Sequence, residues 1–206
     1  MSAVPARLSS EVALGLRIRA IRTEKGWTLE QTGQASGLAR STLSKIENGQ
    51  MSPTYDALIK LASGLQIDLG ELFSSAQKQV GAGRRSISRE GSGTPHATPY
   101  YQHVLLCNDL SNKDMVPFRT RVVARAYEDF DDWSRHVGEE FVYVLSGMVR
   151  LFTEFYEPAD LGPGDSWYID SRMGHRVISL SEADAEVLWL STTHPKTTAN
   201  IPSGVL

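Results

Sequence analysis

Residues 28–49 read TLEQTGQASGLARSTLSKIENG, and this stretch decides the fold of the first third of the chain. Thr28 suits a helix N-cap, and Gln31 stands three positions later, which is the capping-box pattern of a helix start. Gly37 ends this helix, and Gly49 closes a second short helix. The stretch therefore predicts two short helices joined by a tight turn.

The second of these helices, residues 39–48, has two chemically different faces. Leu43 and Ile46 share an apolar face that we expect to be buried. The opposite face, with Thr28 from the preceding helix, supplies the candidate DNA-contacting residues Thr28, Arg40, Ser41, Thr42, Ser44, Lys45 and Asn48. A guanidinium pairs with guanine, and small hydroxyls fit deep in a major groove. We therefore expect Arg40 to contact bases, and Lys45 and Thr28 to contact the DNA backbone.

Apolar residues on both sides of this stretch recur at helical spacing. Leu14, Ile18 and Ile21 predict a helix over residues 11–25, and Leu58, Leu61 and Leu65 predict another after Pro53. The segment LGELF at residues 69–73 adds a fifth short turn. We therefore expect a five-helix domain over residues 11–74, preceded by an N-terminal tail of residues 1–10.

The motifs TLEQ, SGLARSTLSKIENG and SPTYDALIKLASGL, in this order, resemble the lambda-repressor-like (XRE-type) helix-turn-helix transcriptional regulators. The resemblance implies a transcriptional regulator whose partner is operator DNA. It further implies a homodimer that reads a near-palindrome, with half-sites about one helical turn apart. A tetramer is the alternative assembly.

The charge of the chain is distributed unevenly. Residues 1–99 carry 12 Lys and Arg against 8 Asp and Glu, whereas residues 100–206 carry 9 against 16, so that the net charge is −3. The basic half is better suited than the acidic half to a polyanionic partner.

The second half of the chain has the pattern of a β protein. Residues 75–99 are rich in Gly, Ser and basic residues and are interpreted as a linker. Turn clusters then separate seven short segments rich in Val, Tyr, Phe and Trp, at residues 101–107, 119–127, 141–145, 149–155, 166–169, 176–180 and 187–192. Such spacing predicts an antiparallel sandwich or barrel over residues 100–195, followed by a tail of residues 196–206.

Two motifs in this half, WSRHVGEEFVYVLSGMVRLF at 133–152 and LGPGDSWYIDSRMGHR at 161–176, resemble those of the cupin family of jelly-roll barrels. The fold class implied for the whole chain is multidomain α + β, a helix-turn-helix head followed by a C-terminal cupin. The resemblance assigns three metal-ligand positions to His136, Glu140 and His175, while Ser134 replaces a fourth ligand.

Two imidazoles and one carboxylate form a facial triad that suits Fe(II), with Zn and Mn as alternatives. In the alternative without metal, the two histidines hydrogen-bond Glu140 or contact a ligand directly.

The barrel is also expected to sense a small-molecule effector and to support dimerisation. The candidate pocket residues are Tyr101, His103, Arg121, Trp133, His136, Glu140 and His175. For Arg121 the alternative is a solvated outer face, and for the aromatic residues it is simple packing.

An enzyme is the main alternative to a regulator. The hydroxypropylphosphonate epoxidases, which are mononuclear non-haem iron cupin enzymes, look similar across both domains, and their ligand pattern matches His136, Glu140 and His175. The polar face of residues 40–48 remains like that of a regulator, so we expect no catalytic residue.

Composition excludes several other classes of protein. No apolar run reaches the roughly 18–20 residues that a membrane span needs. A single cysteine, Cys107, allows neither an internal disulfide nor a zinc site built from thiolates. We therefore expect a cytoplasmic protein of bacterial type that associates with the nucleoid when it is bound to DNA.

Overall fold

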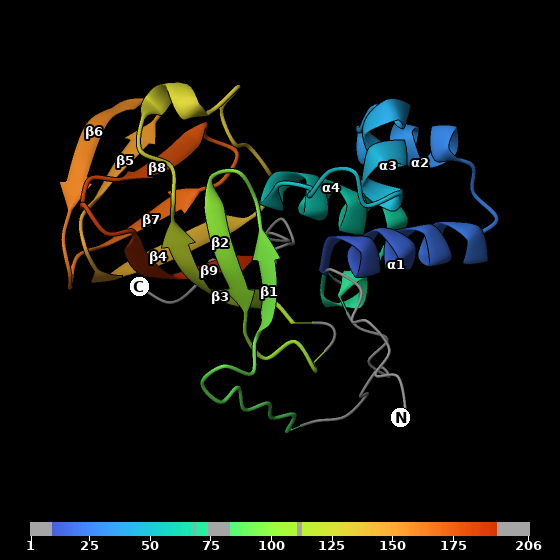
Figure 1. The fold of residues 1–206 in the computed structure, drawn as a ribbon, viewed down its shortest axis with the longest axis horizontal. Coiled ribbons are helices and arrows are strands. Elements are labelled where there is room, and N and C mark those ends of the chain that lie inside the picture. Colours follow the sequence, from blue (N-terminus) through green and yellow to red (C-terminus); the bar gives the residue numbers. More distant parts are fainter. Residues whose placement is uncertain (1–9, 68, 74–82, 111–112, 193–206) are drawn as a thin grey trace, which may run out of the picture.

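The computed structural model describes residues 10–67, 69–73, 83–110 and 113–192. These residues form an N-terminal helical domain and a C-terminal β domain (Figure 1). The helices are α1 (Ser10–Glu24), α2 (Leu29–Ser36), α3 (Arg40–Glu47) and α4 (Tyr55–Leu65), followed by the 3-10 turn η1 (Leu69–Leu72).

Local capping fixes the ends of these short helices. Thr28 caps α2, its hydroxyl accepts from the Gln31 backbone N–H, and the Gln31 side chain accepts from the Thr28 N–H, so the capping box predicted from the sequence is confirmed. Gly37 ends α2 in the left-handed conformation with a φ of 70°, which glycine adopts without strain. Thr54 caps α4 by accepting from the Ala57 N–H.

The expectation of five helices was wrong in its count, because the described residues contain four α-helices. Gln66 ends α4 in the left-handed conformation, which stops the helix before η1 begins. The LGELF segment then makes only the single 3-10 turn η1, which packs through buried Leu69 and Leu72. Asp68, the residue before this turn, lies outside the described residues.

The helical domain is held by an apolar core and by one shielded ion pair. Leu43 and Ile46 on the inner face of α3 are 0% and 1% exposed and belong to one cluster with Ile18. Arg22 of α1 makes two bonds to the Glu47 carboxylate, of 2.6 and 2.9 Å, at the end of α3. Because the Glu47 side chain is only 5% exposed, this pair fixes the end of α3 against α1.

The β domain consists of two antiparallel sheets. The larger sheet has the strand order β1-β2-β3-β9-β4-β7 and the smaller one β6-β5-β8. The strands are β1 (Thr94–Ala97), β2 (Tyr101–Leu105), β3 (Met115–Val122), β4 (Glu139–Ser146), β5 (Val149–Thr153), β6 (Tyr156–Leu161), β7 (Ser166–Asp170), β8 (His175–Ser179) and β9 (Ala185–Thr192). Alternate residues of β3, β4 and β9 are buried, so one face of the larger sheet lines the interior.

Two of these strands were not expected. β1 lies inside residues 75–99, which were interpreted as a linker, and it pairs with β2 from Thr94↔Leu105 to Ala97↔Gln102. β6 pairs with β5 at the edge of the smaller sheet. Five of the six residues of β6 are exposed, so this strand carries no apolar alternation that sequence analysis can detect.

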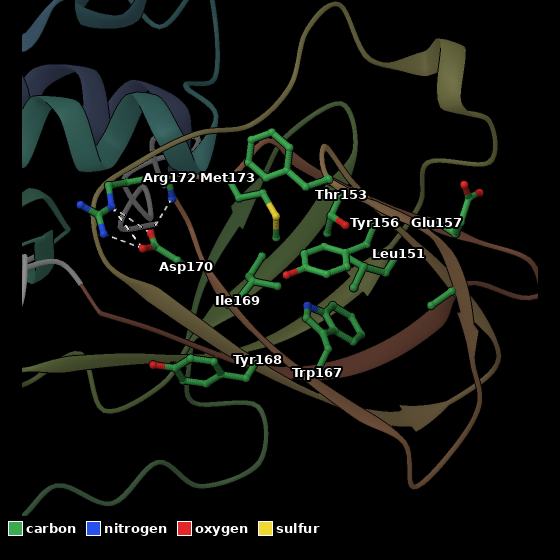
Figure 2. A pocket seen from close by; sticks show the side chains of 12 residues that line it. Leu151, Thr153, Tyr156, Glu157, Trp167, Tyr168, Ile169, Asp170, Arg172 and Met173 are labelled. Carbon is green, nitrogen blue, oxygen red and sulfur yellow. Dashed lines mark hydrogen bonds and ion pairs between the residues drawn. The ribbon is translucent and has the colours of Figure 1, made fainter.

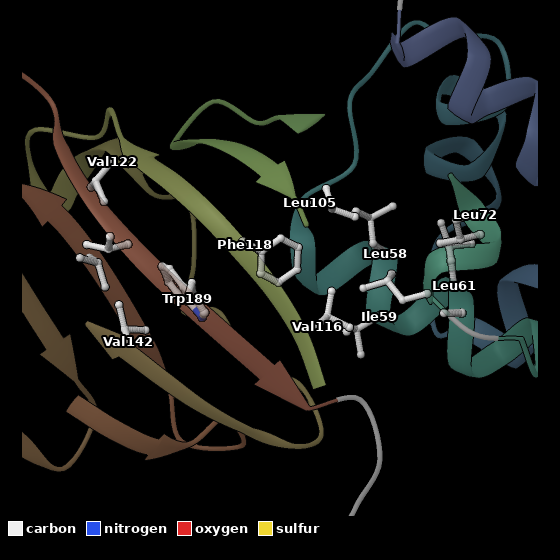
Figure 3. Packing of buried hydrophobic residues seen from close by; sticks show 14 of the residues in the cluster. Leu58, Ile59, Leu61, Leu72, Leu105, Val116, Phe118, Val122, Val142 and Trp189 are labelled. Atoms are coloured by element: carbon white, nitrogen blue, oxygen red, sulfur yellow. The ribbon is translucent and has the colours of Figure 1, made fainter. Parts of the chain in front are cut away.

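The two domains share one hydrophobic core. Leu58 and Ile59 of α4 belong to the same buried cluster as Val116 and Phe118 of β3, and Figure 3 shows these side chains facing one another. The loop before α4 is also bonded to β1, because Ser52 donates to the Ala97 carbonyl at 2.5 Å. The helical domain is therefore docked on the barrel through α4 and the loop that precedes it. Within the described residues, no helix has the length and apolar character that crossing a membrane requires.

Candidate functional site

The first candidate surface is the outer face of α3. Arg40, Ser41, Lys45 and Asn48 are exposed and Thr42 and Ser44 are half-buried, while Thr28 is exposed at the start of α2. In Figure 1, α3 lies on the side of the helical domain away from the β-sheets. Among the described residues, neither Arg40 nor Lys45 forms an ion pair. The polar face of α3 is therefore available to an external partner.

The second candidate site is the group His136, Glu140 and His175 inside the barrel. Each offers one ligand atom, and the three atoms lie within 4.8 Å of one another. His136 Nε2 lies 2.9 Å from Glu140 Oε1, and His175 Nε2 lies 3.5 Å from Glu140 Oε2. The three residues are at most 6% exposed, so water does not screen their charges. We call these three residues the triad.

Backbone carbonyls orient both imidazoles of the triad. The Nδ1 of His136 bonds the Val137 carbonyl at 3.1 Å, and the Nδ1 of His175 bonds the Met173 carbonyl at 2.9 Å. A carbonyl only accepts, so each Nδ1 must carry its proton. This leaves both Nε2 atoms directed at Glu140, the arrangement that metal-ligating histidines adopt.

The charges of the triad are mutually dependent. Burial opposes ionisation of Glu140, but the charges of His175 and His136 and the hydrogen bond from His136 outweigh it and lower the pKa of this carboxyl. Burial likewise lowers the pKa of His136, yet the bond to Glu140 and its charge outweigh burial, and the net change raises that pKa. Glu140 is therefore a buried carboxylate that needs positive charge beside it.

The triad lies in a small chamber. It has a volume of about 30 Å³ and is lined by Tyr55, Tyr101, His103, Phe118, Ser134, His136, Glu140, His175 and Trp189. A single water-sized probe needs about 10–15 Å³ on this measure, so the chamber accommodates an ion with one or two water-sized ligands. A metabolite does not fit there in the described conformation.

Two of the expected pocket residues line this chamber beside the triad. The Tyr101 hydroxyl donates to the Val177 carbonyl at 3.2 Å and accepts from the same residue's N–H, so it is fully engaged. His103 Nδ1 bonds Thr120 Oγ1 at 2.9 Å. Burial, with the nearby His96, lowers the pKa of His103 to about 3, so this ring stays neutral.

The other two expected pocket residues lie elsewhere. Arg121 is exposed on the outer face of β3, with Glu186 at 4.0 Å. Trp133 covers the buried Arg176 guanidinium, which lies 4.8 Å from its ring centre and 4.4 Å from that of Tyr127. Neither Arg121 nor Trp133 lines the chamber.

Tyr55, Phe118 and Trp189 line the chamber but were not expected there. Phe118 and Trp189 belong to strands with ordinary apolar alternation, and nothing in their spacing separates pocket from core. Tyr55 comes from α4, in the other domain. The sequence motifs of the barrel therefore do not predict that Tyr55 lines the chamber.

A cleft of metabolite size lies at a different place in the barrel. It has a volume of about 620 Å³ and opens between β5, β6 and β7 (Figure 2). Tyr156, Trp167 and Met173 supply apolar walls, and the ion pair of Asp170 and Arg172 lies at one end. This volume is within the range of roughly 300–1,000 Å³ that is typical of small-molecule sites.

Comparisons with known proteins identify both domains. Residues 18–72 match the family model described as helix-turn-helix, and residues 126–191 match the model described as cupin domain. Together the two models match more than half of the chain.

The curated relatives are regulators. The HTH-type transcriptional regulator PuuR of Escherichia coli (strain K12) is 27% identical over 197 residues, which cover 91% of this chain and 97% of that protein. The HTH-type transcriptional regulator SutR of the same organism is 31% identical over 64 residues, so the chain covers only 36% of SutR.

Solved structures with the same fold include an HTH_3 family transcriptional regulator from Vibrio cholerae. Its TM-score is 0.63 at 19% identity, over 91% of this chain and 98% of that one. Hydroxypropylphosphonic acid epoxidase from S. wedmorenis reaches a TM-score of only 0.48, at 19% identity over 89% and 98%. The family models and the curated relatives thus favour a regulator over an enzyme, and the chain belongs to the helix-turn-helix transcriptional regulators that carry a C-terminal cupin domain.

Proposed function

We propose that this regulator binds operator DNA through α3 and holds a divalent metal ion at the triad as the signal that it senses. The convergence of three ligand atoms in a buried chamber carries the metal part of this proposal. A proton between His136 and Glu140 would satisfy only their 2.9 Å contact. His175 Nε2 and Glu140 Oε2, 3.5 Å apart, would still make no hydrogen bond of normal length. A cation at the centre would serve all three residues.

The donor set favours particular metals. Two imidazoles and one carboxylate suit Fe(II) and also accept Zn(II) or Mn(II), whereas Mg(II) and Ca(II) prefer oxygen ligands alone. When bound, the metal supplies positive charge beside the Glu140 carboxylate and open positions for small ligands.

The DNA part of the proposal rests on the position of Arg40. It is the first residue of α3, and the N-terminal residues of a recognition helix are those that contact base edges in the major groove. Lys45 lies one turn further along and is placed for phosphate, as is Thr28 at the start of α2.

We also propose that two copies pair through the outer face of the larger sheet. Phe141, Tyr143 and Leu145 alternate outward along β4 and are 39%, 39% and 45% exposed. Tyr168 of β7 is opposite Phe141 in the register and is 59% exposed. We call these four residues the apolar sheet face. Contiguous exposed apolar side chains of this kind mark protein interfaces, and a palindromic operator requires two helical domains.

A larger effector, if this regulator also senses one, would fit the cleft of Figure 2 better than the triad chamber. Trp167 is 8% exposed and its ring N–H has no hydrogen-bond partner among the described residues. A ligand with an acceptor atom would satisfy that donor.

Metal analysis combined with a gel shift tests the proposal. We expect the purified protein to hold about one transition-metal ion per chain and His175→Ala to hold none. Chelation should change the affinity for the DNA upstream of the gene by about 5–150-fold, the usual range of coupling between two sites. A parent protein that takes up no metal, or whose DNA affinity ignores chelation, contradicts the sensing role.

A further inference from the structure

Tyr55 is the one residue of the helical domain that lines the triad chamber, within the described part of the chain. It is the first residue of α4, and its ring lies edge-on to Phe118 and to His136, with centroids 4.9 and 5.4 Å apart. The ring also lies 6.2 Å from that of His103. The DNA-binding domain therefore forms part of the wall around the triad.

Bonds on both sides of the domain boundary fix Tyr55 in this place. His96 of β1 bonds the Pro53 carbonyl through Nε2 at 2.8 Å, and Ser52 donates to the Ala97 carbonyl. Burial lowers the pKa of His96, so the neutral ring donates its Nε2 proton to Pro53. The position of the Tyr55 ring therefore depends on how the two domains are docked.

The polar end of Tyr55 has no hydrogen bond of normal geometry within the described residues, although it is fully enclosed. Burial raises the pKa of this phenol, so it keeps its proton and is a donor. It faces Ser191, which is paired with Glu140 in the β4–β9 register. Within the described residues, Glu140 Oε2, Ser191 Oγ and Trp189 Nε1 likewise make no hydrogen bond of normal geometry, although Trp189 interacts with Glu140 and Ser191 with Tyr55.

Such a group of buried, unpartnered polar atoms around one cavity is unusual, because nearly all buried polar atoms in proteins are hydrogen-bonded. A single water or oxygen ligand beside the triad would satisfy several of them at once. The volume of about 30 Å³ has room for it.

We propose that Tyr55 is a member of the ligand site, and that its hydroxyl donates a hydrogen bond to the water or small oxygen anion held beside the triad. This inference rests on the proposed metal site. A ligand bound in the chamber would then add a hydrogen bond to the first turn of α4. Binding in the chamber would therefore change the contacts of the helical domain directly. By linkage, the docking of α4 on the barrel strengthens binding in the chamber by the same factor.

Tyr55→Phe removes this hydroxyl and keeps the ring. The matched control is Tyr100→Phe, which removes a hydroxyl from the neighbouring tyrosine, whose ring stacks on Phe130 and does not line the chamber. Both variants are compared with the full-length parent, with Co(II) as the probe, by calorimetric titration and by the visible spectrum of the bound ion.

We expect Tyr55→Phe to weaken Co(II) binding about tenfold, which corresponds to one hydrogen bond to a charged site. Tyr100→Phe should change it less than threefold. Without metal, Tyr55→Phe should melt at the same temperature as the parent or higher, because the hydroxyl it removes makes no hydrogen bond of normal geometry within the described residues. In hydrogen exchange, Co(II) should protect the first turn of α4 in the parent and not in Tyr55→Phe.

Three results would overturn the inference, and they are distinguishable. If the parent binds Co(II) and Tyr55→Phe matches it in affinity, spectrum and α4 protection, Tyr55 is only a wall of the chamber, and the metal site stands. If the parent itself binds no metal, the proposed function fails and the inference fails with it. A lowered melting temperature of metal-free Tyr55→Phe would assign the hydroxyl a structural role instead.

Discussion

The outer face of α3 and the triad chamber differ in almost every physical respect. The residues of the α3 face are close together in the sequence, are exposed or half-buried, and form no ion pair within the described chain. The chamber is lined by buried and half-buried residues from β2, β3, β4, β8, β9, α4 and the loop before β4, and the triad itself is at most 6% exposed. The first is a surface that water must leave when a large polyanion binds, and the second is a small buried space with room for an ion and one or two water-sized ligands.

This difference predicts how each region responds to substitution. A change on the α3 face alters contacts with DNA and leaves folding intact, since the exposed side chains make few internal bonds. A change in the chamber alters the balance of buried charge. The following substitutions separate the two regions and the assembly that joins them.

Phe141→Glu should have the largest effect on DNA binding. A charge in the apolar sheet face would separate the two copies, and losing the second contact weakens operator binding by roughly 100–10,000-fold. Light scattering should report the mass of a single chain. Phe155→Glu is the matched control, because Phe155 is 72% exposed but does not belong to this face. If both variants keep the parent's mass, the apolar sheet face is not the interface.

Glu140→Gln should abolish metal binding with little change of shape. Removing outer partners of a metal ligand already costs about 10–100-fold in affinity, so loss of the carboxylate ligand itself should exceed about 100-fold. The control is Glu139→Gln, one residue earlier in β4 on its other face. Metal-free DNA binding should stay within about twofold of the parent, because the α3 face is untouched. Unchanged metal uptake in Glu140→Gln would show that the triad is not the metal site.

Arg40→Ala should have the smallest of these effects on DNA affinity, and this effect should fall on the preference for the operator sequence. We expect it to lose about 1–3 kcal/mol of discrimination between the operator and unrelated DNA. Lys45→Ala is the paired control, which should weaken all DNA nearly equally and reduce the salt slope by about 1. Gel shifts at several salt concentrations measure both. If Arg40→Ala keeps the parent's preference, Arg40 does not contact bases.

The sequence predicted most reliably what depends on neighbouring residues. The capping box at Thr28 and Gln31 was confirmed, and so were the buried Leu43 and Ile46, because capping and helical spacing act over only a few residues. The structure also brings His136, Glu140 and His175 together from two separate motifs. The β6 strand escaped prediction, because an exposed edge strand needs no alternation of apolar residues.

What the sequence did not predict depends on the docking of distant elements. β1 pairs with β2 although its residues look like part of a linker, since pairing uses backbone N–H and C=O groups, and every residue except proline supplies both. Tyr55 reaches the chamber only because α4 packs on β3, and no local pattern records that contact.

The shared core of α4 and the barrel would also limit the spacing between operator half-sites that two paired copies can bind. Because the helical domain is docked on the β domain, two paired copies would hold their α3 helices at a set separation and angle. One extra base pair between half-sites moves the second site by about 3.4 Å and rotates it by roughly 35°. A rigid dimer of this kind would bind the lengthened operator poorly. A dimer whose helical domains were joined to the barrels by flexible linkers would still bind it.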